Sequence, residues 1–309
     1  MPHKLVRLSF FFFSWLFSQQ VASLEHETEM GRHNSIVQVD SDTYALAYSD
    51  ENEKGWIATF TITSNGSSIT EITSLKHNNN QGLYNSLAQV DSDTYLLAYT
   101  GPDNDGFITT FTVPSNGSSI TKVATIEHNT SDASFNSLIQ VDSDTYLLGY
   151  TGSGEDGFIA TFTISSDGAS ITEISELEHQ ASKADYNSLE KVDSDTYALA
   201  YSGPDDDGFI TTFTVASDGS SITEVATIEH NTSDASFNSL IQVDSDTYVL
   251  AYSGTGEDGF IATFTISSNG ANITEVDEIE HDTEKGRYNS VVQVDSDTCL
   301  LYTSDAADE

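Results

Sequence analysis

Acidic loops recur at regular intervals along the chain, and they are the first candidates for chemistry. Each places carboxylates just ahead of a glycine, as in Asp103-Asn104-Asp105-Gly106. Carboxylate oxygens are the hard ligands that Ca²⁺ prefers, so the loops predict a calcium site. The alternative is a solvated turn, because aspartate favours turns by itself. The candidate metal ligands are Asp103, Asp105, Asp156, Asp205, Asp207 and Asp258.

Aromatic residues form a second recurring set, immediately before each Asn-Ser dipeptide. They lie where the chain passes from the end of one predicted group of strands to the start of the next. Packing in the core is one interpretation of this placement. The other is a rim of rings on which a sugar stacks. The candidate rim residues are Tyr84, Phe135, Tyr186, Phe237 and Tyr288.

Two other recurring sets favour structural roles. The segment Asp-Ser-Asp-Thr appears six times, first at residues 40–43, and aspartate side chains fix such turns by accepting bonds from nearby amides. Six histidines recur at the same interval and lie too far apart to bind one metal, so we expect structural hydrogen bonds, with a pH response as the alternative. They are His26, His77, His128, His179, His230 and His281.

No catalytic constellation stands out in the sequence. The chain has three arginines, Arg7, Arg32 and Arg287, and it contains no P-loop, nucleophile elbow or His-Glu-x-x-His motif. Near-identical segments present the same carboxylates again and again. An enzyme site is usually asymmetric, so this symmetry favours binding over catalysis.

These residues belong to a repeat that organises most of the chain. Asn-Ser recurs every 51 residues, at Asn34, Asn85, Asn136, Asn187, Asn238 and Asn289. The full units are 34–84, 85–135, 136–186, 187–237 and 238–288, followed by a partial unit, 289–298. A repeat of this length predicts one supersecondary element that stacks on its neighbours.

Each unit predicts four antiparallel strands and no helix. In the second unit we expect strands at 86–90, 94–100, 107–113 and 120–128, joined by short turns that include Asn116-Gly117. The strand 94–100 (TYLLAYT) is apolar on both faces. A sheet buried on both faces needs a neighbour on each side.

The pattern resembles β-propellers over residues 25–298. The period is similar to that of kelch and Asp-box repeats, and the turns at 166–172 and 217–223 resemble a degenerate Asp-box. The acidic loops are also similar to the calcium loops of integrin-type propellers. The resemblance implies an all-β propeller of four-stranded antiparallel blades, six of them visible and the last truncated. It also implies that Leu24-Glu25-His26 form an outer strand that closes the ring. An open solenoid of small sheets is the alternative.

Composition restricts the partners. The 309 residues include 10 Lys+Arg and 49 Asp+Glu, a formal charge of −39, which argues against nucleic acids and anionic membrane surfaces. With 37% hydrophobic residues the chain has enough apolar material for a core. We expect a monomer that binds a protein or a glycan at its loop face, the face that carries the acidic loops.

Both ends of the chain read differently from the repeat. Residues 1–23 predict a secretory signal peptide, with Lys4 and Arg7 before a ten-residue apolar run; an uncleaved anchor is the alternative. The mature protein is expected at Leu24, secreted or at the cell surface, or periplasmic if the host has an outer membrane. Residues 299–309 (CLLYTSDAADE) match a transposase-type sequencing adaptor read in frame. They predict a non-native tail that contains the sole cysteine, Cys299.

Together these observations predict an exported acidic propeller that is not an enzyme. Its expected role is a non-catalytic binding, scaffold or cell-surface interaction module. The alternatives are a calcium-assisted glycan-binding propeller, or a hydrolase or lyase whose site lies in a missing part of the chain.

Overall fold

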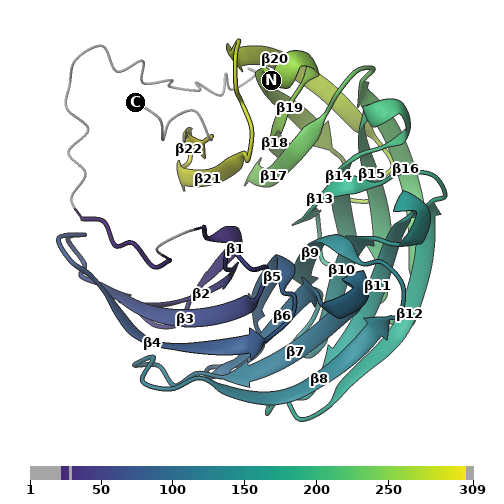
Figure 1. Ribbon diagram of the computed structural model, residues 1–309. Helices are drawn as coiled ribbons and strands as arrows, with labels where there is room; N and C mark the ends of the chain where they lie inside the picture. The colour runs from purple at the N-terminus through teal and green to yellow at the C-terminus, as the bar shows by residue number, and fades with distance from the viewer. Residues whose placement is uncertain (1–21, 28–29, 304–309) are drawn as a thin grey trace. The chain divides into compact units, whose positions relative to one another are not determined.

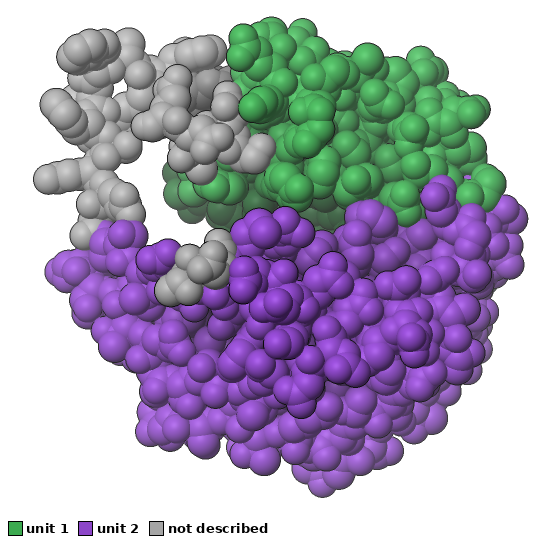
Figure 2. Space-filling model, in the orientation of Figure 1, with its two compact units in different colours: residues 1–18, 182–215, 223–309 green, residues 19–181, 216–222 purple. Residues whose placement is uncertain are grey.

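The computed structural model describes residues 22–27 and 30–303, and most of the predicted signal peptide lies outside this part. The described residues form five four-stranded antiparallel sheets and one two-stranded sheet, which we number as blades 1–6 in chain order. The chain divides into two compact units, and Figure 2 colours them separately.

Residues 19–181 and 216–222 make up the unit that contains blades 1–3. In each blade the four strands follow one another in the sheet in chain order (Figure 1). Blade 1 consists of β1 (Arg32–Gln38), β2 (Thr43–Ser49), β3 (Gly55–Ile62) and β4 (Ile69–Asn78). Blade 2 consists of β5 (Leu83–Gln89), β6 (Thr94–Thr100), β7 (Gly106–Thr112) and β8 (Thr121–Asn129). Blade 3 consists of β9 (Ser134–Gln140), β10 (Thr145–Thr151), β11 (Gly157–Ile164) and β12 (Ile171–Gln180).

Residues 182–215 and 223–303 form the described part of the other unit, with blades 4–6. Blade 4 consists of β13 (Asp185–Lys191), β14 (Thr196–Ser202), β15 (Gly208–Val215) and β16 (Ile222–Asn231). Blade 5 consists of β17 (Ser236–Asp244), β18 (Thr247–Ser253), β19 (Gly259–Ile266) and β20 (Ile273–Asp282). Blade 6 has β21 (Ser290–Asp295) and β22 (Thr298–Tyr302). Single 3₁₀ turns follow the second strand of blades 2–5: η1 (Pro102–Asn104), η2 (Ser153–Glu155), η3 (Pro204–Asp206) and η4 (Thr255–Glu257).

The prediction of four-stranded repeat units is confirmed, and strand β6 has the predicted bounds. Its two faces are buried against different neighbours, as the apolar pattern predicted. Tyr95, Leu97 and Tyr99 pack with residues of blade 1, whereas Leu96 and Ala98 pack with residues of blade 3. This two-sided burial supplies the hydrophobic stabilisation that holds consecutive blades together.

Within each unit, the Asn-Ser dipeptide fastens a blade to the one before it. Asn136 Nδ2 donates a hydrogen bond of 3.2 Å to the carbonyl oxygen of Tyr84, and the backbone N–H of Leu138 donates one of 3.0 Å to Ser86 Oγ. The same pair of bonds joins blade 5 to blade 4, through Asn238 and Ser188. The dipeptide therefore has a structural role in the repeat. Its asparagine donates a hydrogen bond to the preceding blade, and its serine accepts one from the following blade.

The turn that resembles an Asp-box also has a packing role. Gly168, with φ of 69°, closes the turn between β11 and β12, and its carbonyl accepts a bond of 2.7 Å from Thr110 Oγ1 in blade 2. Thr212 of blade 4 donates in the same way to Gly270 of blade 5, at 2.8 Å. A left-handed φ favours glycine, which explains why glycine occupies this position of the turn.

The two ends of the described chain depart from the repeat. Residues 22–27 form no strand, so the closing outer strand stays a prediction. His26 nevertheless packs edge-on against Tyr48, with ring centroids 4.7 Å apart, as His77 does against Tyr99. At the other end Cys299 pairs with Gln293, so residues 299–302 of the predicted non-native tail continue β22. The described residues contain no helix that is long and apolar enough to cross a membrane.

Candidate functional site

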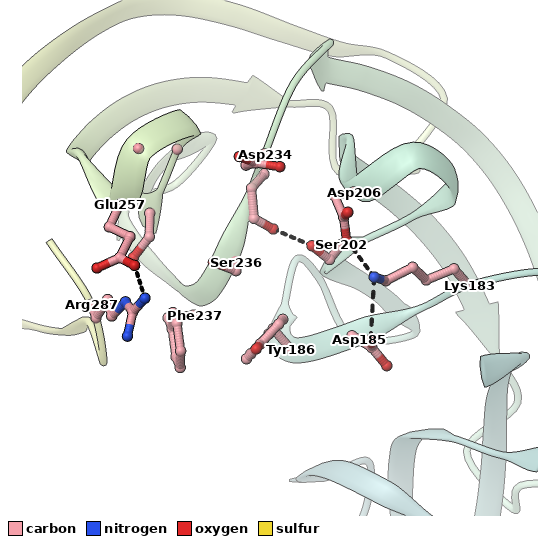
Figure 3. Close-up of a pocket in the computed structure, with 14 residues that line it drawn as sticks. Lys183, Asp185, Tyr186, Ser202, Asp206, Asp234, Ser236, Phe237, Glu257 and Arg287 are labelled. Atoms are coloured by element: carbon pink, nitrogen blue, oxygen red, sulfur yellow. Dashed lines mark hydrogen bonds and ion pairs between the residues drawn. The ribbon is translucent and has the colours of Figure 1, made fainter. Parts of the chain in front are cut away.

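A cavity of about 580 Å³ lies in the unit formed by blades 4–6 (Figure 3). Two kinds of connection line it. One kind is the turn between the second and third strands of a blade, η3 and η4, which contribute Asp206 and Glu257. The other is the link from a fourth strand to the next first strand, which contributes Asp234 and Arg287.

The 3₁₀ turns place their acidic residues by means of left-handed backbone. Asp206 has φ of 69° and Glu257 has φ of 74°. Each turn is fixed to the following link, because Ala235 N–H donates to the carbonyl of Asp206 at 2.9 Å and Gly286 N–H donates to that of Glu257 at 2.6 Å. Positive φ is uncommon outside glycine, and these backbone bonds hold it.

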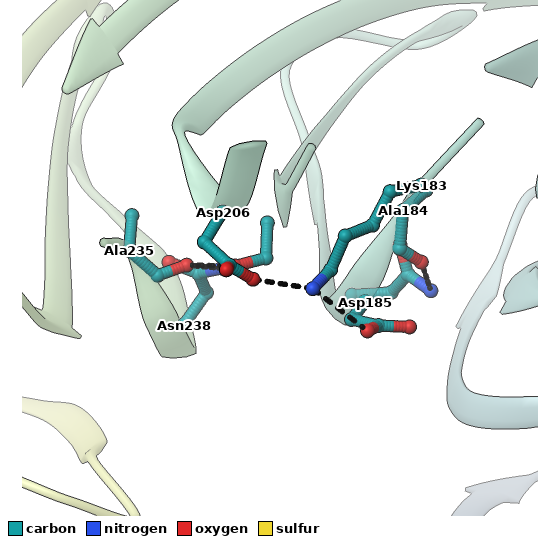
Figure 4. Close-up of polar contacts among 8 residues, drawn as sticks. Lys183, Ala184, Asp185, Asp206, Ala235 and Asn238 are labelled. Atoms are coloured by element: carbon teal, nitrogen blue, oxygen red, sulfur yellow. Dashed lines mark hydrogen bonds and ion pairs between the residues drawn. The ribbon is translucent and has the colours of Figure 1, made fainter. Parts of the chain in front are cut away.

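Three ion pairs lie at the cavity, and two of them cross it. Lys183 Nζ lies 3.6 Å from Asp185 Oδ2 and donates a short hydrogen bond to Asp206 Oδ1 (Figure 4). Arg287 pairs with Glu257 through its NH2 nitrogen. The partners of the Lys183–Asp206 and Arg287–Glu257 pairs come from different connections, so these two pairs join the two kinds of loop. Asp234 makes no ion pair within the described residues.

Aromatic rings form one wall of the same cavity. Tyr186 and Phe237 both line it, with ring centroids 4.6 Å apart, and Phe237 lies 4.5 Å from Tyr288. All three have left-handed backbone, with φ of 53–54°. Burial, and then the charge of Asp185, raise the pKa of Tyr186. In the other unit His33, Tyr84 and Phe135 form an equivalent row, with centroids 4.3 and 4.4 Å apart.

The repeat varies in charge at several of the positions that line the cavity. Four residues ahead of each Asn-Ser the chain carries Met30, Gln81, Asp132, Lys183, Asp234 and Lys285. Two residues ahead it carries Arg32, Leu83, Ser134, Asp185, Ser236 and Arg287. The blades thus differ in charge where the connections face the cavity, although their strands are nearly identical. These differences in charge between repeats could have indicated the site from the sequence. The prediction overlooked them because it relied on the similarity of the repeats.

The predicted ligands and the cavity overlap in part. Of the predicted rim, Tyr186 and Phe237 line the cavity, Tyr288 ends the row with 63% of its surface exposed, and Tyr84 and Phe135 belong to the other unit. Their role as a ligand rim stays a prediction. Sequence reasoning did not select Lys183, Asp185, Asp206, Asp234, Glu257 or Arg287 as site residues.

The predicted metal ligands lie beside the cavity residues in the chain rather than among them. Asp205, Asp207 and Asp258 flank Asp206 and Glu257, and none of the three lines the cavity. Asp103, Asp105 and Asp156 occupy the corresponding turns of blades 2 and 3. Among residues 22–27 and 30–303 no group of three or more His, Cys, Asp or Glu side chains is arranged to hold a metal ion. Calcium binding stays a prediction.

The expectation that the histidines make structural hydrogen bonds is wrong for three of them. Both ring nitrogens of His77, His128 and His230 are buried and have no hydrogen-bond partner among the described residues. Each ring instead packs edge-on between a tyrosine and a phenylalanine; for His128 the centroids of Tyr150 and Phe162 lie 5.1 and 5.6 Å away. A Cβ on Gly106 would lie 2.5 Å from His128 Nε2, which explains the glycine that ends the acidic loop.

No protein family model matches the sequence, and no curated protein matches it. Solved structures do match. A putative 6-phosphogluconolactonase from Bacteroides fragilis has a TM-score of 0.64 at 14% identity, over 88% of this chain and 77% of that one. The periplasmic gluconolactonase PpgL of Pseudomonas aeruginosa has a TM-score of 0.64 at 11% identity, over 82% and 73%. The GH93 α-L-arabinofuranosidase of Fusarium graminearum has a TM-score of 0.56 at 12% identity, over 86% and 85%.

These similarities show the fold, which is the predicted β-propeller of four-stranded blades. They contradict the prediction of a non-catalytic binding or scaffold module, together with its calcium-assisted glycan-binding alternative, because several chains of this fold are named as hydrolases. The prediction of a non-catalytic protein was wrong because it assumed that near-identical repeats cannot form an asymmetric site. The symmetry holds in the strands and fails in the connections that line the cavity.

Proposed function

We propose that this protein is a hydrolase that opens a cyclic ester, with the cavity of blades 4–6 as its active site. The observation that carries the proposal is the meeting of four carboxylates with a lysine and an arginine in one cavity. Ester hydrolysis needs a base that activates water and a positive group near the oxyanion. The names of the lactonases that share the fold support the choice of a lactone over other esters.

Asp234 is assigned as the general base. It is the carboxylate in the cavity that makes no ion pair among the described side chains, so its oxygens remain available to a water molecule. In this mechanism Asp234 takes a proton from the water as the oxygen attacks the ester carbonyl. Lys183 and Arg287, each held by a carboxylate, supply positive charge near the oxyanion. The ring C–O bond then breaks, Asp234 returns its proton to the leaving alkoxide oxygen, and the product is a hydroxy acid.

Asp234→Asn is expected to lower kcat for glucono-1,5-lactone by at least about 100-fold, the usual range for loss of a general base. Proton release at pH 7, corrected for spontaneous hydrolysis, measures the rate. Asp132→Asn is the matched control, because residues 129–135 and 231–237 have the same sequence, NTSDASF, and Asp132 lies outside the cavity. Full activity in Asp234→Asn would refute the assignment of the base, and no activity in the unaltered protein would refute the proposed function.

We also propose that the protein is exported. The charged start and apolar run of residues 1–23 support a signal peptide, and one chain that shares the fold is named as periplasmic. Expression of the full chain in a secreting host is expected to release a protein that begins near Leu24. Amino-terminal sequencing of the released protein checks this, and a retained Met1 would contradict it.

A further inference from the structure

The charge of the cavity restricts which cyclic esters can bind in it. Asp185, Asp206, Asp234 and Glu257 face Lys183 and Arg287, so four carboxylates against two cations leave a formal charge of −2. The whole chain adds to this field, with a formal charge of −39. A site of this sign repels anions and raises the local concentration of neutral or cationic molecules.

The two cations in the cavity are already engaged. Lys183 lies between Asp185 and Asp206, and Arg287 is paired with Glu257 (Figure 3). A phosphate group entering the cavity would have to displace a carboxylate from one of them. Phosphate recognition in proteins relies on Arg and Lys groups that are directed at the anion, and these two are directed at side chains of the protein.

The aromatic wall favours a molecule with an apolar face. Tyr186 and Phe237 line the cavity as neighbouring rings 4.6 Å apart, and their left-handed backbone is held in place. The bond from Asn238 Nδ2 to the carbonyl of Tyr186, at 3.3 Å, fixes one, and that from Asn289 Nδ2 to the carbonyl of Phe237, at 3.4 Å, fixes the other. A saturated ring with hydroxyl groups offers C–H bonds to such a wall and hydroxyls to the carboxylates.

We infer that the substrate is an uncharged, hydroxyl-rich cyclic ester and that its phosphorylated counterpart is excluded. The inference rests on the proposed hydrolase function and narrows it. Glu257 is the specificity-determining residue that the charges single out, because its side chain neutralises Arg287. It positions and shields the arginine and is assigned no bond-making step.

The test compares glucono-1,5-lactone with 6-phosphoglucono-1,5-lactone by proton release. The mature protein, which begins near Leu24, is expected to show a kcat/KM at least 100-fold higher for the neutral lactone than for the phosphorylated lactone. Glu257→Gln is expected to reduce that ratio at least tenfold, because it removes a negative charge and exposes Arg287 to the phosphate. Glu155→Gln, at the same position in blade 3, is expected to leave the ratio unchanged. Equal or better hydrolysis of the phosphorylated lactone, or an unchanged ratio in Glu257→Gln, would overturn the inference.

A second measurement separates this inference from the proposed function. Saturation-transfer NMR with D-glucose and D-glucose 6-phosphate reports binding without hydrolysis. Binding of glucose alone, with no lactone opened, would refute the hydrolase and leave the preference for an uncharged ring in place. Lactone hydrolysis together with binding of glucose 6-phosphate would refute the preference and leave the hydrolase in place. Binding of neither sugar, with no hydrolysis, would refute both.

Discussion

Between pH 7.5 and pH 5, three buried histidines are expected to contribute a loss of about 6 kcal/mol in the stability of the protein. Burial lowers the pKa of His77 to about 3, with a smaller contribution from the charge of Lys122, and burial lowers those of His128 and His230 to about 4. Their rings are packed among aromatic side chains and their nitrogens have no partner in the described chain. A charged imidazole at these positions therefore has no counter-ion or acceptor among the described residues.

The direction follows from proton binding in the two states. The unfolded chain binds a proton at each histidine below the ordinary pKa of 6.5, whereas the folded chain does so only near pH 4 or below. Stability is therefore unaffected above pH 7 and falls as the pH drops through 6.5. At pH 5 the loss amounts to about 2 kcal/mol for each such histidine. Three of them together remove a large part of the stability of an ordinary domain.

Thermal melting followed by circular dichroism at pH 7.5 and pH 5.0 measures the effect. His128→Phe keeps a ring between Tyr150 and Phe162 and removes the titrating group, so its stability is expected to depend less on pH, by about 2 kcal/mol between the two conditions. His26, which is not among the rings with both nitrogens unpaired, offers a control in His26→Phe. If His128→Phe lost as much stability between pH 7.5 and pH 5.0 as the unaltered protein does, His128 would be protonated in the fold without penalty.

The strands could be predicted from the sequence because each signal is local. The bounds of β6 follow from the seven-residue run TYLLAYT between two turns, and the blade contacts follow from its two apolar faces. The Asn-Ser interval predicted the five four-stranded sheets and the partial sixth that the described residues form. The role of Asn and Ser was not predictable, because Asn136 finds its acceptor on Tyr84, 52 residues earlier, and only the packing of blades brings the two together.

The cavity could be predicted only in part. Tyr186 and Phe237 were candidates because aromatic residues recur. The ion pairs were not, since Lys183 and Asp206 are 23 residues apart and Arg287 and Glu257 are 30 apart. Local patterns drew attention to Asp205, Asp207 and Asp258, whereas the carboxylates of these turns that line the cavity belong to their neighbours Asp206 and Glu257.

Replacement of Glu190 by isoleucine is expected to stabilise the protein by about 3 kcal/mol at pH 8. Glu190 lies in β13, at a position where the other units carry apolar residues. They are Val37, Ala88, Ile139, Ile241 and Val292. Burial raises its pKa from 4.5 to about 7, although backbone N–H groups of Gln242 and Lys191 oppose the shift. The carboxylate is therefore charged at pH 8 in a site that disfavours its charge.

The pH dependence distinguishes this effect from simple repacking. The unfolded chain releases the proton of Glu190 near pH 4.5 and the folded chain near pH 7, so the carboxylate destabilises the fold increasingly as the pH rises through this range and fully above it. The gain from Glu190→Ile is thus expected to fall to about 1 kcal/mol at pH 5. Glu190→Gln keeps the shape and removes the charge, so it is expected to give part of the gain at pH 8. Urea unfolding at both pH values measures these differences. A gain that is the same at pH 5 and pH 8 would mean that Glu190 titrates normally in the fold and that the isoleucine acts through packing alone.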